Sequence, residues 1–150
     1  MRAHFGSGKA IAILDTCATS TVALSYLVFL CTQAAQRPRD LPKAMLVPAC
    51  GLVFATILRK TINRPRPYET HDIKPLIRKE QRGESCPSRH VFSAAIIAFT
   101  VLHYVPKAGF AMLVASLAVA FSRVAGGVHY VSDTIASFLL AGIWSLLLFL

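Results

Sequence analysis

Two histidines, each beside groups that could handle phosphate, are the residues of this sequence best suited to catalysis. His129 precedes Asp133 by four residues, a spacing that on a helix places the imidazole and the carboxylate on one face. A carboxylate that binds one ring nitrogen fixes the tautomer and makes the other nitrogen a better nucleophile or base. Such a pair alone is more often structural than catalytic, so its meaning depends on the groups around it.

His90 is the second candidate, and it belongs to the segment Pro87-Ser88-Arg89-His90 at the start of an apolar run. Proline suits the beginning of a helix, so the sequence predicts that Ser88, Arg89 and His90 form a first helical turn. Unpaired backbone N–H groups and the helix dipole favour a bound anion there. We interpret this segment as half of a phosphate-binding site.

Positive charge is concentrated in the segment that leads to His90. Residues 59–89 hold nine of the 16 basic residues and four of the seven acidic ones, a formal charge of +5. Within this segment Arg59 and Arg66 lie seven residues apart, and two prolines keep the chain extended, so the two guanidinium groups can converge. Binding to anionic lipid headgroups is the simpler alternative. Nucleic acid is disfavoured, because Tyr68 is the only aromatic residue of the segment that could stack on bases.

A third guanidinium belongs to the segment that contains His129. Ser122 and Arg123 end another apolar stretch, and Gly126 and Gly127 then permit a tight turn before His129. The sequence therefore predicts that three arginines and two histidines meet where apolar stretches end.

The elements that position these residues are predicted to be membrane helices. Hydrophobic residues make up 55% of the chain and charged residues 15%, a balance unlike that of a soluble domain. Five apolar stretches approach the roughly 20 residues that span a bilayer: residues 10–34, 41–58, 91–105, 108–121 and 134–150. We predict an all-α integral membrane bundle of about five transmembrane helices, a single domain over residues 1–150. The shorter stretches could instead be buried core helices or re-entrant segments.

The first stretch is too long and too polar for a typical signal peptide, so we expect a retained helix with one polar side. Its carboxylate, Asp15, could lie in the interface near the helix end or contact a basic residue of the site. We favour the interface.

Three of these segments resemble the type 2 phosphatidic acid phosphatase (PAP2) family, the histidine phosphatases that include membrane lipid phosphatases and share their site with vanadium-dependent haloperoxidases. The family pattern is K-x6-R-P, then P-S-G-H, then S-R-x5-H-x3-D. The matching residues here are Arg59 with Arg66-Pro67, Pro87 to His90, and Ser122-Arg123 with His129 and Asp133. The resemblance covers residues 59 to 133, and three motifs in the right order are far more specific than one.

The resemblance implies a mechanism that agrees with the residue chemistry. His129, oriented by Asp133, would attack phosphorus to form a phosphohistidine, His90 would protonate the leaving oxygen, and water would hydrolyse the intermediate. The groups that stabilise the phosphoryl oxygens would be Arg59, Arg66, Ser88, Arg89 through its N–H, and Arg123. No metal and no other cofactor is expected: no carboxylate cluster adjoins the motifs to hold magnesium, and Cys86 with His90 lacks the second ligand pair of a zinc site.

Three departures from the family pattern stand out. Arg59 replaces lysine, which keeps a positive charge but exchanges the compact ammonium group for a planar guanidinium group. Arg89 replaces glycine; it would be strained if the backbone required a positive φ, and its side chain could either serve a second phosphate or point to solvent and headgroups. The family's membrane enzymes usually have six spanning helices, and this chain has five candidates, with one missing near the N-terminus.

The substrate class follows from where the motifs lie. A lipid phosphate could present its headgroup to them while its tail stays among the helices, and isoprenyl diphosphate, phosphatidic acid and phosphatidylglycerol phosphate all qualify. Arg89 tilts the expectation to a diphosphate. A lipid phosphotransferase with the same residues and a non-catalytic lipid-binding protein are the alternatives, whereas a transporter is disfavoured because the charges lie at helix ends. The expected partners are the bilayer and the lipid substrate, without nucleic acid, and no protein-partner motif is recognisable.

The orientation in the membrane is ambiguous. With five alternating helices, the side that carries the motifs holds 12 of the 16 basic residues, so the positive-inside rule would place it in the cytoplasm. The family resemblance implies an extracytoplasmic site. We discount the charge count, because the motif arginines are explained by phosphate binding. We expect a cell-membrane protein with an extracytoplasmic active site.

Overall fold

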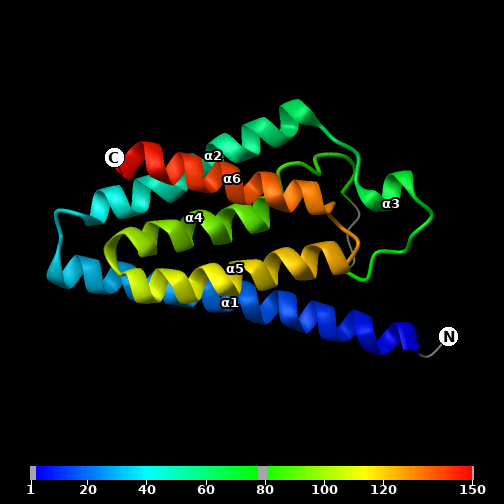
Figure 1. The fold of residues 1–150 in the computed structure, drawn as a ribbon, viewed down its shortest axis with the longest axis horizontal. Coiled ribbons are helices and arrows are strands. Elements are labelled where there is room, and N and C mark those ends of the chain that lie inside the picture. Colours follow the sequence, from blue (N-terminus) through cyan, green and yellow to red (C-terminus); the bar gives the residue numbers. More distant parts are fainter. Residues whose placement is uncertain (1–2, 78–80, 150) are drawn as a thin grey trace.

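The computed structural model describes residues 3–77 and 81–149, and for residues 3–7 it describes only the main chain. Five long helices run side by side in alternating directions (Figure 1): α1 (Ala3–Gln36), α2 (Leu41–Ile62), α4 (Arg89–Tyr104), α5 (Pro106–Ala125) and α6 (Val131–Phe149). A short helix, α3 (Pro67–Thr70), interrupts the long connection between α2 and α4. The predicted all-α bundle of about five helices is confirmed. Arg78, Lys79 and Glu80 of the basic segment, and Leu150, lie outside the described residues.

The helix α4 forms the centre of the bundle, because it packs against α1, α2, α5 and α6. Its buried side chains include Phe92, Ile96 and Val101 together with three alanines that let neighbouring helices approach. Its 16 residues measure about 24 Å at 1.5 Å per residue, whereas four spans in the described part of the chain are long and apolar enough to cross a membrane: Gly8–Gln36, Leu41–Thr70, Pro106–Ala125 and Val131–Phe149. The apolar stretch at 91–105 therefore forms a helix that is shorter than these four and lies buried among them.

A proline inside α2 is accommodated by contacts from two other helices. Pro48 has no N–H to give to the carbonyl of Ala44, four residues earlier, and the hydroxyl of Tyr26 in α1 donates to that carbonyl at 3.0 Å instead. The indole Nε1 of Trp144 in α6 donates to the carbonyl of Val47 at 3.1 Å. These bonds join α2 to α1 and to α6.

The connection between α2 and α4 folds over one end of the bundle. The helix α2 ends at Ile62, and Asn63 beyond it adopts a left-handed conformation with φ of 44°. Farther along, the N–H of Leu76 donates to the carbonyl of Gly126 at 3.0 Å. Both glycines of the turn after α5 are needed, since Gly127 has φ of +73° and a Cβ at Gly126 would lie 2.8 Å from the backbone oxygen of Ser122. The connection is thus tied to the turn that carries His129.

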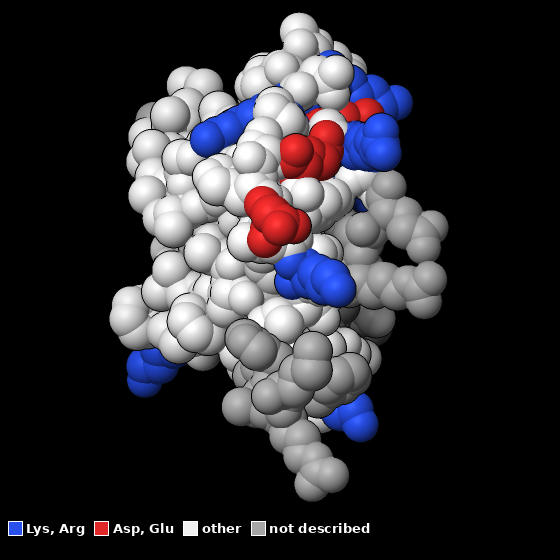
Figure 2. All heavy atoms as spheres, turned by 90° about the vertical axis from the view of Figure 1, so that its right-hand side faces the viewer, with Lys and Arg blue, Asp and Glu red and all other residues white. Residues whose placement is uncertain are grey.

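This end of the bundle also holds the beginning of α1, to the right in Figure 1. Figure 2 looks onto this end and shows lysine, arginine and acidic side chains close together on the surface. The predicted arrangement agrees with the ribbon, in which the beginning of α1, the connection from α2 to α4 and the end of α5 lie on one side. Arg123 stands in the last turn of α5.

Candidate active site

His129 lies in the turn before α6, which begins at Val131, so a helix that carries both His129 and Asp133 is not what forms. The two side chains still meet, with His129 Nδ1 3.6 Å from Asp133 Oδ2. The contact survives because Asp133 stands in the first turn of α6 and its Oδ2 accepts the backbone N–H of Tyr130 at 3.0 Å. Both side chains are almost completely buried.

The carboxylate of Asp133 has two further partners that the sequence did not reveal. The hydroxyl of Ser85, itself buried, donates to Oδ2 and lies 3.5 Å from His129 Nδ1. Arg64 Nη1 donates to Oδ1 at 2.7 Å, and its guanidinium lies 4.2 Å from the centre of the Tyr130 ring. Arg64 could have been suspected from its place between the predicted arginines, but nothing in the sequence pointed to Ser85.

The predicted pair Arg59 and Arg66 converges on one backbone carbonyl. Arg59 in the last turn of α2 donates through Nη2 to the carbonyl of Glu84, and Arg66, completely buried, donates to the same oxygen through Nη2 at 3.4 Å. Arg66 also donates to the carbonyls of Gly83 at 2.9 Å and of Val128 at 3.3 Å. The extended arm between the two prolines therefore joins α2, the connection and the turn of His129.

Arg123 is buried in the last turn of α5 and is paired with Asp15. Asp15 Oδ2 lies 2.8 Å from Arg123 Nη2, and Asp15 Oδ1 accepts the hydroxyl of Ser122 at 2.7 Å. The expectation that Asp15 lies in the interface away from the site is wrong, because a carboxylate inside a helical bundle is stabilised by pairing with a buried cation.

Three buried donors around this site have no hydrogen-bond partner: Arg59 Nε, Arg123 Nε and Ser88 Oγ. An unsatisfied buried polar group costs about 1–3 kcal/mol, and each of the three is a donor of the kind that an oxyanion accepts from. Among the described side chains, residues 8–77 and 81–149, no group of three or more His, Cys, Asp or Glu could hold a metal ion.

The start of α4 differs slightly from the prediction. Ser88 is the N-cap and α4 begins at Arg89, so Pro87 and Ser88 precede the helix. Ser88 is held by Ser137 of α6, whose hydroxyl accepts its N–H at 2.8 Å, and His90 occupies the first turn. Arg89 is exposed and helical, so the replacement of glycine needs no positive φ.

Next to the first turn of α4, burial raises the pKa of the Cys86 thiol, and the negative charge of Asp133 raises it further.

The family model of the PAP2 superfamily matches residues 43–150. The chain belongs to the PAP2 superfamily. The family recognised from residues 59 to 133 is therefore confirmed.

One curated relative, undecaprenyl-diphosphatase BcrC of Bacillus subtilis (strain 168), is 31% identical over 99 residues, which cover 66% of this chain and 51% of that protein. The chain thus spans about half the length of the curated relative it matches. Two solved structures share the fold. The PAP2 type phosphatidylglycerolphosphate phosphatase from Bacillus subtilis has a TM-score of 0.68 at 23% identity, covering 97% of this chain and 82% of its own.

The second structure, LpxE of Aquifex aeolicus, has a TM-score of 0.71 at 22% identity, covering 91% and 85%. With four apolar helices of spanning length, the PAP2 fold makes this chain an integral membrane protein.

Proposed function

We propose that the chain is a metal-independent membrane phosphatase that hydrolyses a lipid phosphate or diphosphate through a phosphohistidine. The observation that carries the proposal is the buried pair His129–Asp133 at the same end of the bundle as three buried donors that make no hydrogen bond, Arg59 Nε, Arg123 Nε and Ser88 Oγ. A nucleophile with its orienting carboxylate and fixed donors for oxyanions are the parts that phosphoryl transfer requires.

In the proposed reaction the second ring nitrogen of His129, Nε2, attacks phosphorus in line. The bond from phosphorus to the leaving oxygen breaks, and His90 gives that oxygen a proton. Water then attacks the phosphohistidine, releases phosphate and returns a proton to His90. The oxygens of the transferred group would be bound by Arg59, Arg66, Arg123, Ser88 and the N–H of Arg89. We expect kcat/KM to pass through a maximum with pH, because His129 must be neutral and His90 protonated at once.

We favour an isoprenyl diphosphate as the substrate. The relative with 31% identity is an undecaprenyl-diphosphatase, and Arg89 offers an exposed cation at the first residue of α4, next to Ser88 and His90, for a second phosphate. A lipid tail would find apolar grooves among the helices. One groove of about 290 Å³ between α1, α2 and α4 reaches Ser93, one turn after Arg89.

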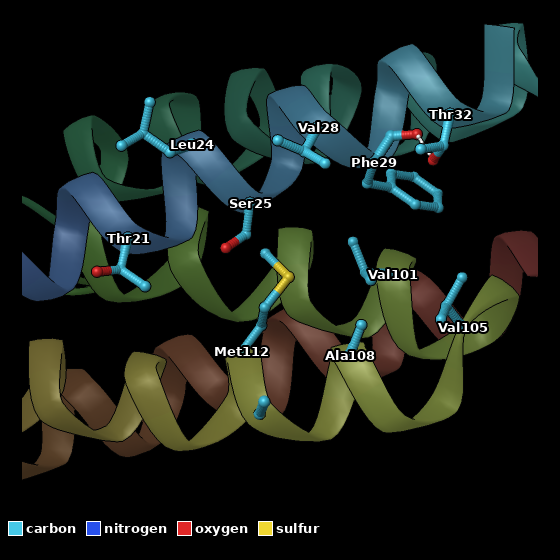
Figure 3. A pocket seen from close by; sticks show the side chains of 11 residues that line it. Thr21, Leu24, Ser25, Val28, Phe29, Thr32, Val101, Val105, Ala108 and Met112 are labelled. Carbon is cyan, nitrogen blue, oxygen red and sulfur yellow. Dashed lines mark hydrogen bonds between the residues drawn. The ribbon is translucent and has the colours of Figure 1, made fainter. Parts of the chain in front are cut away.

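A larger groove of about 530 Å³ opens between α1, α4 and α5. Figure 3 shows Val28, Phe29, Val101 and Met112 around it. None of its lining residues is a predicted site residue, so we assign it to bilayer lipid and not to the reacting headgroup.

Phosphate release tests the proposal. The detergent-purified chain would be given an isoprenyl diphosphate, phosphatidic acid or phosphatidylglycerol phosphate with EDTA present. We expect metal-independent release that falls by about a thousandfold or more in His129→Ala, as for loss of a nucleophile. His103→Ala, an exposed histidine in the last turn of α4, should retain full activity.

The same assay separates the alternatives. Release that requires a second, acceptor lipid would identify a phosphotransferase, and folded protein without release from any substrate would indicate a lipid-binding protein. We further propose a cell-membrane location with the site on the extracytoplasmic side. A membrane-impermeant thiol reagent should then label an Arg82→Cys variant in intact cells, and labelling only after lysis would contradict this orientation.

A further inference from the structure

We propose that Asp15 of α1 is a positioning residue that holds the guanidinium of Arg123 in place for the phosphoryl group. This inference rests on the proposed function, because it takes Arg123 as a phosphate-binding residue. It extends the site to a helix that lies outside both the three motifs and residues 43–150, the part matched to the family.

Both oxygens of Asp15 bind consecutive residues of α5. Oδ2 lies 2.8 Å from Arg123 Nη2, and Oδ1 accepts the hydroxyl of Ser122 at 2.7 Å. Asp15 is 9% exposed and Arg123 4%, so the pair is shielded from water and weakly screened. A carboxylate held at both oxygens leaves the guanidinium little freedom to rotate.

The same guanidinium keeps a donor for a ligand. Arginine presents its N–H groups in one rigid plane, and the pair with Asp15 uses Nη2 while the buried Nε has no partner. The backbone of Arg123 is tied to the catalytic turn as well, since its carbonyl accepts the N–H of His129 at 3.3 Å and that of Val128 at 3.2 Å. Fixing the plane of Arg123 through Asp15 therefore fixes Nε relative to His129.

Replacing Asp15 by asparagine keeps the shape and removes the charge. A buried cation without its counter-ion is strongly unfavourable, so Arg123 should turn toward another acceptor and Nε should leave its position. The change in charge alone would act in the opposite direction, because removing a negative charge near an anion site lessens repulsion and raises the affinity for the anion. The sign of the change in anion affinity thus distinguishes positioning from charge balance.

The test measures orthovanadate binding and phosphate release by the full chain in detergent. Vanadate adopts the five-coordinate shape of an in-line displacement and reports on the donors without requiring turnover. We expect Asp15→Asn to weaken vanadate binding and kcat/KM by about 10- to 100-fold, less than the 100- to 1,000-fold typical for losing an oxyanion donor itself. Asp15→Glu should recover part of the loss. The matched control is Thr19→Val, one turn along α1 with its buried hydroxyl unpartnered, and we expect a change below about twofold.

A double-mutant cycle shows whether Asp15 acts through Arg123. In an Arg123→Lys background, Asp15→Asn should lower vanadate affinity by less than about twofold further. Full additivity, tighter vanadate binding by Asp15→Asn, or an equal loss in Thr19→Val would each overturn the inference. If the wild type binds vanadate but releases no phosphate, the proposed function falls and vanadate affinity still decides the role of Asp15. If the wild type binds no vanadate, both fall.

Discussion

Neutralising Glu84 should make the site bind inorganic phosphate more tightly. The Glu84 carboxylate lies 3.6 Å from Arg59 Nε, the atom that lacks a hydrogen-bond partner, so an incoming phosphate must compete with it. In Glu84→Gln the backbone carbonyl that receives Arg59 and Arg66 is unchanged. Competition for Arg59 is removed while the support of both arginines remains.

The size of the gain follows from the geometry. Two unit charges 3.6 Å apart interact by about 4–5 kcal/mol at an effective dielectric constant of about 20. The Glu84 side chain is 27% exposed, and partly exposed pairs contribute nearer to about 0.2–1 kcal/mol. We take about 1 kcal/mol, which corresponds to roughly a fivefold tighter phosphate affinity.

The assay is equilibrium binding of radiolabelled inorganic phosphate to the purified wild type, Glu84→Gln and Asp72→Asn. Asp72 is an exposed carboxylate of the same connection, and its replacement should change the affinity by less than about 1.5-fold, as expected for a screened surface charge. An unchanged or weaker affinity in Glu84→Gln, with an unaltered melting temperature, would refute the assignment of Arg59 Nε to the anion. An equal gain in phosphate affinity in Asp72→Asn would show that the effect comes from the net charge of the connection and not from the contact between Glu84 and Arg59.

Three further predictions concern single side chains. Ser85→Ala should lower kcat for phosphate release about tenfold or more, because a hydrogen bond to a charged carboxylate contributes about 1.5–3 kcal/mol. The control is Ser116→Ala, which removes an equally buried serine of α5 and should leave kcat unchanged. Equal losses of kcat in the two variants would show that Ser85 has no special role in the site. The raised pKa of Cys86 means that little thiolate exists at pH 7. Maleimide labelling of residue 86, followed by mass spectrometry, should therefore be slow at pH 7 and accelerate toward pH 9. Fast labelling at pH 7 would contradict the raised pKa of this thiol. Gly109→Ala should lower the melting temperature in detergent, since the new Cβ would lie 2.2 Å from Leu102 Cα and overpacking costs about 1–3 kcal/mol. Gly142→Ala should be tolerated, because its Cβ would make ordinary contacts with Phe99 at 3.5 Å. Equal melting temperatures of the two variants would refute the tight contact between α4 and α5.

The helices were largely predictable because a bilayer demands long apolar runs, and the five runs correspond to α1, α2, α4, α5 and α6. The position of α4 was not predictable with the same certainty. A helix surrounded by protein and a helix surrounded by lipid are both apolar, so hydropathy does not distinguish them. Length was the one informative signal, because the 16 residues of α4 are fewer than the roughly 20 typical of a spanning helix, whereas its burial depends on the packing of four other helices around it.

The motif spacing located the eight predicted site residues at one end of the bundle, but it did not reveal the residues that hold them in place. Motif spacing describes residues close in sequence, whereas Asp15 and Ser122 are 107 positions apart and Arg64 and Asp133 are 69 apart. Ser85 and the carbonyl of Glu84 carried no signal, because a lone serine and a backbone group have no sequence pattern. Such partners depend on how helices and connections pack in three dimensions.

The junction of α4 and α5 has a consequence for biosynthesis. Only Val105 separates the two helices, and α4 by itself is shorter than a typical spanning helix. We expect the insertion machinery to accept α4 and α5 together as one helical hairpin, in which the longer helix α5 promotes insertion of the shorter helix α4. A nascent chain stalled before α5 would then leave His90 outside the bilayer, and the two histidines would come together only after α6 had emerged from the ribosome.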